Sequence, residues 1–278
     1  MSRRPLFLLA LAALSASAAA FVWLVAFHVP GGRRFDAAAL QAFAGVVRAP
    51  LAPSTNGIAA LADPLPFLLG ALLLVAIALL RRRWLMAAIV PAVLLGANAC
   101  TQALKPALTD PRLIDVDGVA HLYPGSWPSG HSTASMSLAL CLVLVVGPRL
   151  RPLAALAGAA YAIGVGYSLV SAGWHLPSDV FGGYLVAASF TLLGAAVLAA
   201  LERREAAASA VWPAIPWRAL AAPAAALAGA GAIVTLAAVA RTPDGAVALR
   251  HVEVLVVAFA IAALGLALTA GLALVLRR

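Results

Sequence analysis

Long apolar runs alternate with short polar connectors along the whole chain. A helix that crosses a bilayer needs about 20 mostly apolar residues. Eight runs approach that length, and the second is short unless it begins earlier, near Ile58. The pattern predicts an all-α, polytopic transmembrane helical bundle with spans at Leu6–His28, Phe67–Leu80, Trp84–Leu104, His131–Val146, Leu153–Val170, Asp179–Leu201, Ala219–Ala240 and Val254–Leu276.

Composition supports the same class. The 278 residues are 64% hydrophobic and only 10% charged, whereas a soluble domain carries roughly 25% charged residues. The net charge of +9 could suggest a nucleic-acid partner. However, the basic residues cluster between apolar spans, where they act as a topology signal. We therefore expect membrane lipids, and no nucleic acid, as partners.

The distribution of basic residues predicts an orientation. Alternation of the spans places 12 of the 19 Lys and Arg residues on the side that holds both termini. By the positive-inside rule, that side is cytoplasmic, which predicts a multi-pass inner (plasma) membrane protein. The start, "MSRRPLFLLALAALSASAAAFVW", also resembles a signal peptide. Because its apolar run continues to Phe27, an uncleaved first helix is the preferred interpretation.

Two units are expected. Residues 1–204 would form a six-helix membrane core, and residues 205–278 a cytoplasmic linker with two further spans for packing or homodimer formation. The amphipathic piece "RRFDAAALQAFAGVVRAPL" within residues 29–65 is expected to lie flat at the membrane interface. Cys100 and Cys141 sit in apolar spans, so packing is favoured over a disulfide or a metal pair.

Polar side chains gather in three connectors on the predicted outer face. The first contains "KPALTDPR", the second "PSGH" and the third "SAGWHLPSD". Together they bring these candidate residues to one membrane boundary: Lys105, Arg112, Ser129, Gly130, His131, His175 and Asp179. The remaining histidines, His28, His121 and His251, are interpreted as ordinary polar residues at a wet boundary.

The residue types favour an anion as ligand. Lys105 and Arg112 can bind a phosphate, which the planar guanidinium suits especially well. Pro128 fits the first turn of a helix whose N-terminal N–H groups also attract phosphate. Gly130 allows close approach of the backbone, and Ser129 adds a hydroxyl donor.

The two remaining histidines can divide a phosphoryl transfer between them. His175 and Asp179 are four residues apart, so the carboxylate can fix the imidazole tautomer of a nucleophile. His131 could then protonate the leaving group and activate water. A metal site is the less favoured alternative, because cationic side chains and helix N-termini surround these residues.

At this point the sequence resembles the type 2 phosphatidic acid phosphatases, membrane lipid phosphatases related to vanadium haloperoxidases. Their motifs are Lys-x6-Arg-Pro, Pro-Ser-Gly-His and Ser-Arg-x5-His-x3-Asp. The chain reads "KPALTDPRL", "PSGH" and "SLVSAGWHLPSD" in the same order. The resemblance covers about residues 60–200.

The resemblance implies a role for each matching position. His175 would become phosphohistidine, Asp179 would orient it, and His131 would be acid and base. Lys105 and Arg112 would bind the phosphate together with Ser129 and the Gly130 amide. No metal or cofactor is implied, and the implied substrates are lipid phosphates and diphosphates, including phosphatidic acid, phosphatidylglycerol phosphate and polyprenyl diphosphate.

Two positions depart from the family pattern. Leu113 follows Arg112 where the family has Pro, which changes only the loop. Leu169 replaces a second phosphate-binding arginine. A charge-assisted hydrogen bond contributes about 1.5–3 kcal/mol, and losing one from a transition state costs about 10²–10³ in rate. Three arginines on the predicted outer side are candidate substitutes, namely Arg48, Arg241 and Arg250.

Three functions remain open on the sequence alone. The leading hypothesis is a lipid phosphate or diphosphate phosphatase whose active site faces outside. The second is a phosphotransferase that uses the same site with a lipid or sugar acceptor. The third is a catalytically weakened protein that binds or transports lipid phosphates. Retention of His131, His175 and Asp179 favours catalysis, because binding alone needs no His–Asp pair.

Overall fold

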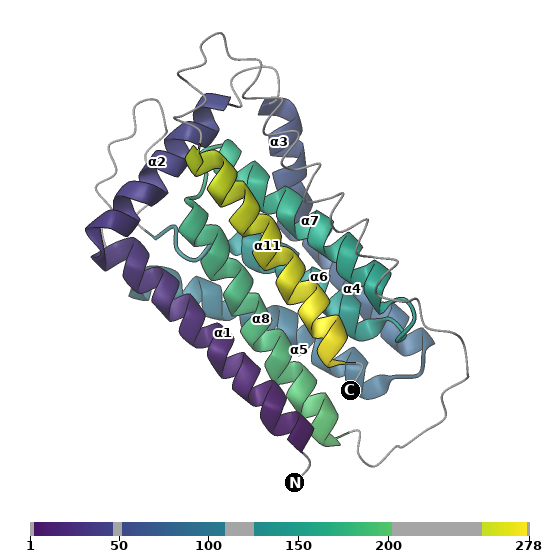
Figure 1. The fold of residues 1–278 in the computed structure, drawn as a ribbon. Helices are drawn as coiled ribbons and strands as arrows, with labels where there is room; N and C mark the ends of the chain where they lie inside the picture. The colour runs from purple at the N-terminus through teal and green to yellow at the C-terminus, as the bar shows by residue number, and fades with distance from the viewer. Residues whose placement is uncertain (1–2, 47–51, 109–124, 202–251, 277–278) are drawn as a thin grey trace.

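The computed structural model describes residues 3–46, 52–108, 125–201 and 252–276, and these form a bundle of helices (Figure 1). The elements are α1 (Arg3–His28), α2 (Pro30–Val46), α3 (Ala52–Ala59), the 3-10 helix η1 (Ala60–Ala62), α4 (Pro64–Leu80), α5 (Trp84–Ala107), α6 (Gly130–Val145), α7 (Arg151–Ser171), α8 (Pro177–Leu201) and α11 (Val252–Val275).

The predicted all-α membrane bundle is confirmed. Among the described residues, five helices are long and apolar enough to cross a membrane, namely α1, α5, α7, α8 and α11, and a bent pair brings the number to six. The α6 helix is apolar but shorter than these. The predicted span Ala219–Ala240 lies outside the described residues, so the total of eight spans stays a prediction.

The second predicted span is a broken helix. It begins before Phe67, but α3 and η1 meet α4 at an angle of 49°. The break falls at Asp63, whose backbone is extended, and Pro64 opens α4. Proline disfavours helical backbone at the preceding residue, which explains the position of the break.

Helices α6 and α8 form the centre of the bundle. Helix α6 is surrounded by α4, α5, α7, α8 and α11, and α1 runs along α8 (Figure 1). Met136 and Leu140 of α6 are fully buried, as is Tyr184 of α8. The Tyr184 hydroxyl donates to the carbonyl oxygen of Ala162 in α7. Both cysteines carry free thiols, and that of Cys141 is buried in this core, in keeping with the packing role predicted for it.

Helix α11 packs into the same core as the earlier helices. Ile261 and Val257 belong to the main cluster of buried apolar residues, and the Tyr167 hydroxyl of α7 donates to the Ala258 carbonyl oxygen at 2.6 Å. At the other end of α11, the Leu276 carbonyl oxygen accepts hydrogen bonds from Arg4 and Arg151. The start of α1, the start of α7 and the end of α11 therefore share one end of the bundle. The predicted boundary at residues 204 and 205 lies outside the described residues.

Helix α2 packs its apolar face on the bundle. It buries Ala39, Leu40 and Phe43 against the other helices, and its predicted position flat at the membrane interface stays a prediction. It contacts α7, α8 and α11 as well as α1. The apolar stripe of an amphipathic helix can pack against a membrane interface or against a protein surface. Sequence periodicity does not distinguish these two environments.

Candidate active site

The polar end of α6 is a capped helix N-terminus. Ser129 is the N-cap, and its Oγ accepts a hydrogen bond from the Ser132 N–H at 3.3 Å. Its carbonyl oxygen accepts from the backbone N–H and the hydroxyl of Thr133, each at 3.0 Å. A helix N-terminus carries partial positive charge, so this one is suited to an anion.

Lys105 lies beside that helix end. Its Nζ is 3.9 Å from the position that a Cβ on Gly130 would occupy. A hydrogen bond of 2.9 Å between the hydroxyls of Thr101 and Thr133 holds the end of α5 against the first turn of α6. The Lys105 ammonium group and the positive end of α6 are thereby brought close together. This arrangement favours binding of a phosphate.

His175 and Asp179 form a hydrogen-bonded pair. The His175 Nδ1 lies 3.2 Å from Oδ2 of Asp179, and the carboxylate is completely buried. The same Oδ2 accepts the Leu176 backbone N–H at 3.1 Å. Because Asp179 engages Nδ1, Nε2 is the His175 nitrogen that remains available to a ligand.

Asp179 also connects the two motifs. Its carbonyl oxygen accepts the backbone N–H of Ser129 at 3.0 Å. The helices approach closely here, because a Cβ on Gly183 would lie only 2.7 Å from the Ser129 carbonyl oxygen. Glycine at position 183 therefore lets α8 carry Asp179 up to the N-terminus of α6.

The end of α7 presents His175 through a Schellman motif. Gly173 has a φ of 72°, a conformation that favours glycine. The Gly173 N–H donates to the Val170 carbonyl oxygen and the Trp174 N–H to that of Leu169. These bonds terminate α7 and turn the chain toward α8.

A second carboxylate supports the start of α8. Asp36 of α2 is buried and accepts both the backbone N–H of Ser178, at 3.0 Å, and the Ser178 hydroxyl, at 2.5 Å. Ser178 immediately precedes Asp179, so this contact fixes the turn that holds the His175–Asp179 pair. The sequence analysis missed Asp36, which reads simply as the polar face of an amphipathic helix.

His131 stands at the first turn of α6 with two neighbours that the sequence analysis also missed. Its Nε2 lies 2.9 Å from Oδ1 of Asp63. Its ring centroid is 6.0 Å from that of Trp174, the residue before His175. The Asp63-Pro64 pair signals a helix start in the sequence, but that signal does not indicate a contact with His131.

Leu169 points into an apolar cluster. Its side chain is completely buried with Ala59, Ala62 and Val165, and Tyr161 packs against the group. The side chain at this position therefore contacts the α3–η1 segment. Arg112 and Leu113 lie outside the described residues, as do the candidate substitutes Arg48, Arg241 and Arg250.

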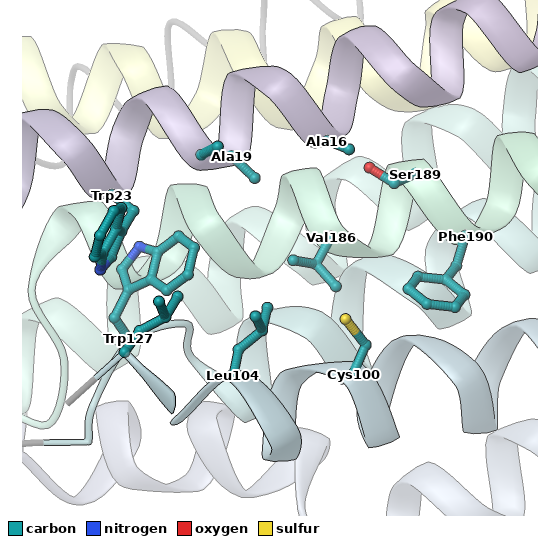
Figure 2. A pocket seen from close by; sticks show the side chains of 11 residues that line it. Ala16, Ala19, Trp23, Cys100, Leu104, Trp127, Val186, Ser189 and Phe190 are labelled. Carbon is teal, nitrogen blue, oxygen red and sulfur yellow. The ribbon is translucent and has the colours of Figure 1, made fainter. Parts of the chain in front are cut away.

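An apolar pocket of about 350 Å³ adjoins the polar residues. Figure 2 shows Trp23 and Trp127 side by side at one end, with Leu104, Cys100 and Phe190 farther along. Helices α1, α5 and α8 form its walls. Leu104 directly precedes Lys105, and Trp127 lies two residues before Ser129. The pocket is therefore lined by the chain segments that also carry Lys105 and Ser129.

Within residues 3–46, 52–108, 125–201 and 252–276, no group of three or more His, Cys, Asp or Glu side chains is arranged to hold a metal ion.

Comparison with known proteins assigns the family. A family model described as the PAP2 superfamily matches residues 86–203, the segment that contains Lys105, the α6 N-terminus and the His175–Asp179 pair. Residues 86–203 belong to the PAP2 superfamily. This match supports the resemblance to the type 2 phosphatidic acid phosphatases, and it supports a phosphatase. Asp36, Asp63 and α11 lie outside the PAP2 segment.

A solved structure shares the fold of most of the chain. It is described as the crystal structure of the first transmembrane PAP2 type phosphatidylglycerolphosphate phosphatase from Bacillus subtilis. The TM-score is 0.56 at 22% sequence identity, and the alignment covers 73% of this chain and 99% of that one. No curated protein is significantly similar in sequence. The chain is therefore an integral membrane protein with a PAP2 fold.

Proposed function

We propose that the chain is a membrane lipid phosphatase that hydrolyses a lipid phosphomonoester, or the pyrophosphate bond of a lipid diphosphate, through a phosphohistidine intermediate. The observation that carries this proposal is the double contact of Asp179. Its carboxylate holds His175, while its carbonyl oxygen holds Ser129 at the mouth of α6. One residue thus positions a nucleophile against a phosphate-binding helix end, which is the arrangement that covalent phosphoryl transfer requires.

The first step forms the phosphoenzyme. The lone pair on Nε2 of His175 attacks phosphorus, and the bond between phosphorus and the leaving oxygen breaks with its electron pair on oxygen. Asp179 stabilises the imidazolium that forms, through the Nδ1 hydrogen bond. His131 donates a proton to the leaving oxygen. Lys105, Ser129, the Gly130 amide and Arg112 would stabilise the charge on the phosphoryl oxygens.

The second step regenerates the enzyme. Water attacks phosphorus, and neutral His131 accepts a proton from that water. The bond between phosphorus and Nε2 then breaks, and its electron pair returns to the nitrogen of His175. Inorganic phosphate leaves, and both histidines regain their starting states, so the cycle consumes only water.

The pocket beside Trp127 supports a lipid as the substrate. Its walls are apolar, and two of its lining residues, Leu104 and Trp127, lie one and two positions in the sequence from Lys105 and Ser129. A hydrocarbon chain attached to the phosphate would bury apolar surface there, which is favourable. Phosphatidic acid, phosphatidylglycerol phosphate and polyprenyl diphosphate all present this combination. We place the reaction at the extracytoplasmic face, because the basic residues favour a cytoplasmic position for the opposite end.

The burial of Leu169 favours one alternative. An apolar side chain where the family places an arginine is consistent with a weakened protein that binds lipid phosphates without turnover. A phosphotransferase with the same site would show phosphate on an acceptor instead of free phosphate. The His175–Asp179 pair supports turnover over binding alone.

Phosphate release tests these functions directly. Purified protein in lipid nanodiscs should release phosphate from at least one of the three lipids in the presence of a metal chelator. His175→Ala should reduce release to background, and His28→Ala, at an exposed histidine, serves as the matched control. Acid-labile labelling of wild type by a ³²P-labelled substrate should disappear in His175→Ala. Binding without release by folded wild type would refute the phosphatase proposal.

A further inference from the structure

Asp63 and His131 come from distant parts of the chain. The Asp63 Oδ1 and the His131 Nε2 are 2.9 Å apart, although 68 residues separate them in sequence. Asp63 occupies the break between η1 and α4. The pair is partly open to solvent, with 48% of the Asp63 side chain and 30% of the His131 side chain exposed. A solvent-exposed ion pair contributes little to folding stability, so stabilisation of the fold does not explain the contact.

Two contacts with α7 fix the position of Asp63. The Tyr161 hydroxyl donates to the carbonyl oxygen of Leu61 at 2.9 Å. Leu169 packs against Ala59 and Ala62 in a closed apolar cluster. The residue that replaces the family's arginine therefore supports the segment that carries the Asp63 carboxylate.

We propose that Asp63 is a positioning residue that makes His131 an effective acid and base. This inference rests on the proposed phosphatase function. The carboxylate accepts the Nε2–H of His131 and keeps the proton on that nitrogen. Nδ1 is then the nitrogen that exchanges a proton with the substrate. Asp63 acts on His131 as Asp179 acts on His175, but it holds the opposite ring nitrogen.

The same contact serves both steps. In the first, protonated His131 gives its Nδ1 proton to the leaving oxygen, while the Nε2–H stays bonded to Asp63. Neutral His131 then has its lone pair on Nδ1, where it can accept the proton of the attacking water. Without Asp63 the neutral imidazole can place its proton on Nδ1, and that tautomer cannot act as the base from that nitrogen.

The choice of leaving group distinguishes this role from a structural one. An alkoxide is strongly basic, so its departure depends on protonation by His131. The leaving group of 4-nitrophenyl phosphate departs readily without an acid. Loss of a positioned acid should therefore slow alkyl phosphates selectively, whereas a general loosening of the site should slow both substrates alike.

The experiment compares dioctanoyl phosphatidic acid with 4-nitrophenyl phosphate. For Asp63→Asn we expect kcat/KM on the alkyl phosphate, which reports formation of the phosphoenzyme, to fall about tenfold or more. We expect kcat/KM on the aryl phosphate to change less than about threefold. The kcat values also contain hydrolysis of the phosphoenzyme, which both substrates share, so kcat should fall for both. The matched control is Asp36→Asn, which alters a buried carboxylate beside the same site and should slow both substrates by a similar factor. Asp63→Glu keeps the charge and should recover part of the alkyl activity.

Two outcomes would overturn the inference. One is an unchanged ratio of alkyl to aryl kcat/KM in Asp63→Asn, whether both values fall equally or neither changes. The other is a gain on both substrates, which would mean that Asp63 blocks the phosphate site. If Asp63→Asn does not fold, Asp63→Ala is the second variant, and a ratio equal to that of wild type would count against the inference. Inactive folded wild type would instead refute the proposed function, and the positioning role would fall with it.

Discussion

The backbone N–H of Ser129 donates to the carbonyl oxygen of Asp179 at 3.0 Å. This bond joins the N-terminus of α6 to the first turn of α8, although 50 residues separate the two in the sequence. The Asp179 side chain meanwhile holds His175. Asp179 therefore sets the geometry between the phosphate site and the nucleophile through one backbone contact and one side-chain contact. The two contacts can be altered separately.

Asp179→Asn tests the side-chain contact alone. The backbone bond to Ser129 does not depend on the side chain, so the fold should persist. The amide can favour the wrong tautomer of His175, and we expect kcat to fall about 10²- to 10⁴-fold. Phosphate release measures the loss, and an unchanged thermal transition serves as the control. Wild-type kcat in this variant would remove Asp179 from the mechanism.

Gly183→Ala tests the close approach of α8 to α6. The new Cβ would lie 2.7 Å from the Ser129 carbonyl oxygen and 2.9 Å from the Thr133 backbone nitrogen. Backbone atoms cannot move aside easily, so we expect a destabilisation of about 1–3 kcal/mol, together with lower phosphate release.

Gly271→Ala is the matched control for this variant, because no atom beyond its chain neighbours and its own helix backbone lies within 4 Å of its new Cβ. Thermal unfolding in the same detergent compares the two proteins. Equal transition temperatures would show that the helices do not require the close approach.

Leu169→Arg tests whether the site lacks a cation or has an apolar support there. The leucine is fully buried with Ala59 and Ala62. An unpaired guanidinium in that cluster should destabilise the protein by about 3 kcal/mol or more and lower phosphate release. Leu169→Met preserves apolar volume and should cost less than about 1.5 kcal/mol. A folded Leu169→Arg protein with raised activity would mean that this side chain can reach the bound phosphate.

Ala20→Phe tests the apolar pocket as the site of the lipid chain. Ala20 lines the pocket, and a phenyl ring there should fill part of it. We expect KM for long-chain phosphatidic acid to rise about tenfold, equivalent to about 1.4 kcal/mol, with 4-nitrophenyl phosphate hydrolysis unchanged. Ala13→Phe, at an exposed position of the same helix that does not line the pocket, is the control. Identical kinetics for the two variants would argue against a chain in this pocket.

The sequence by itself determined what depends on neighbouring residues. Apolar runs fix where membrane helices form, because an unpaired backbone cannot be exposed to lipid. The Ser129-Gly130 turn marks the start of α6 through local capping. The spacing of His175 and Asp179 brings the imidazole, in the turn before α8, within reach of a carboxylate in the first turn of α8. These features depend on residues close in sequence, so periodicity and motif spacing were sufficient to predict them.

Only the tertiary structure decided which distant residues meet. The contact of Asp63 with His131 depends on a break before Pro64 and on the packing of Leu169 under η1. Asp36 reaches Ser178 across 142 residues because α2 packs onto the bundle. Amphipathic periodicity predicts that one face of a helix will be buried, but it does not predict which surface that face will pack against. Carboxylates at such positions read as ordinary polar residues until packing brings them to their partners.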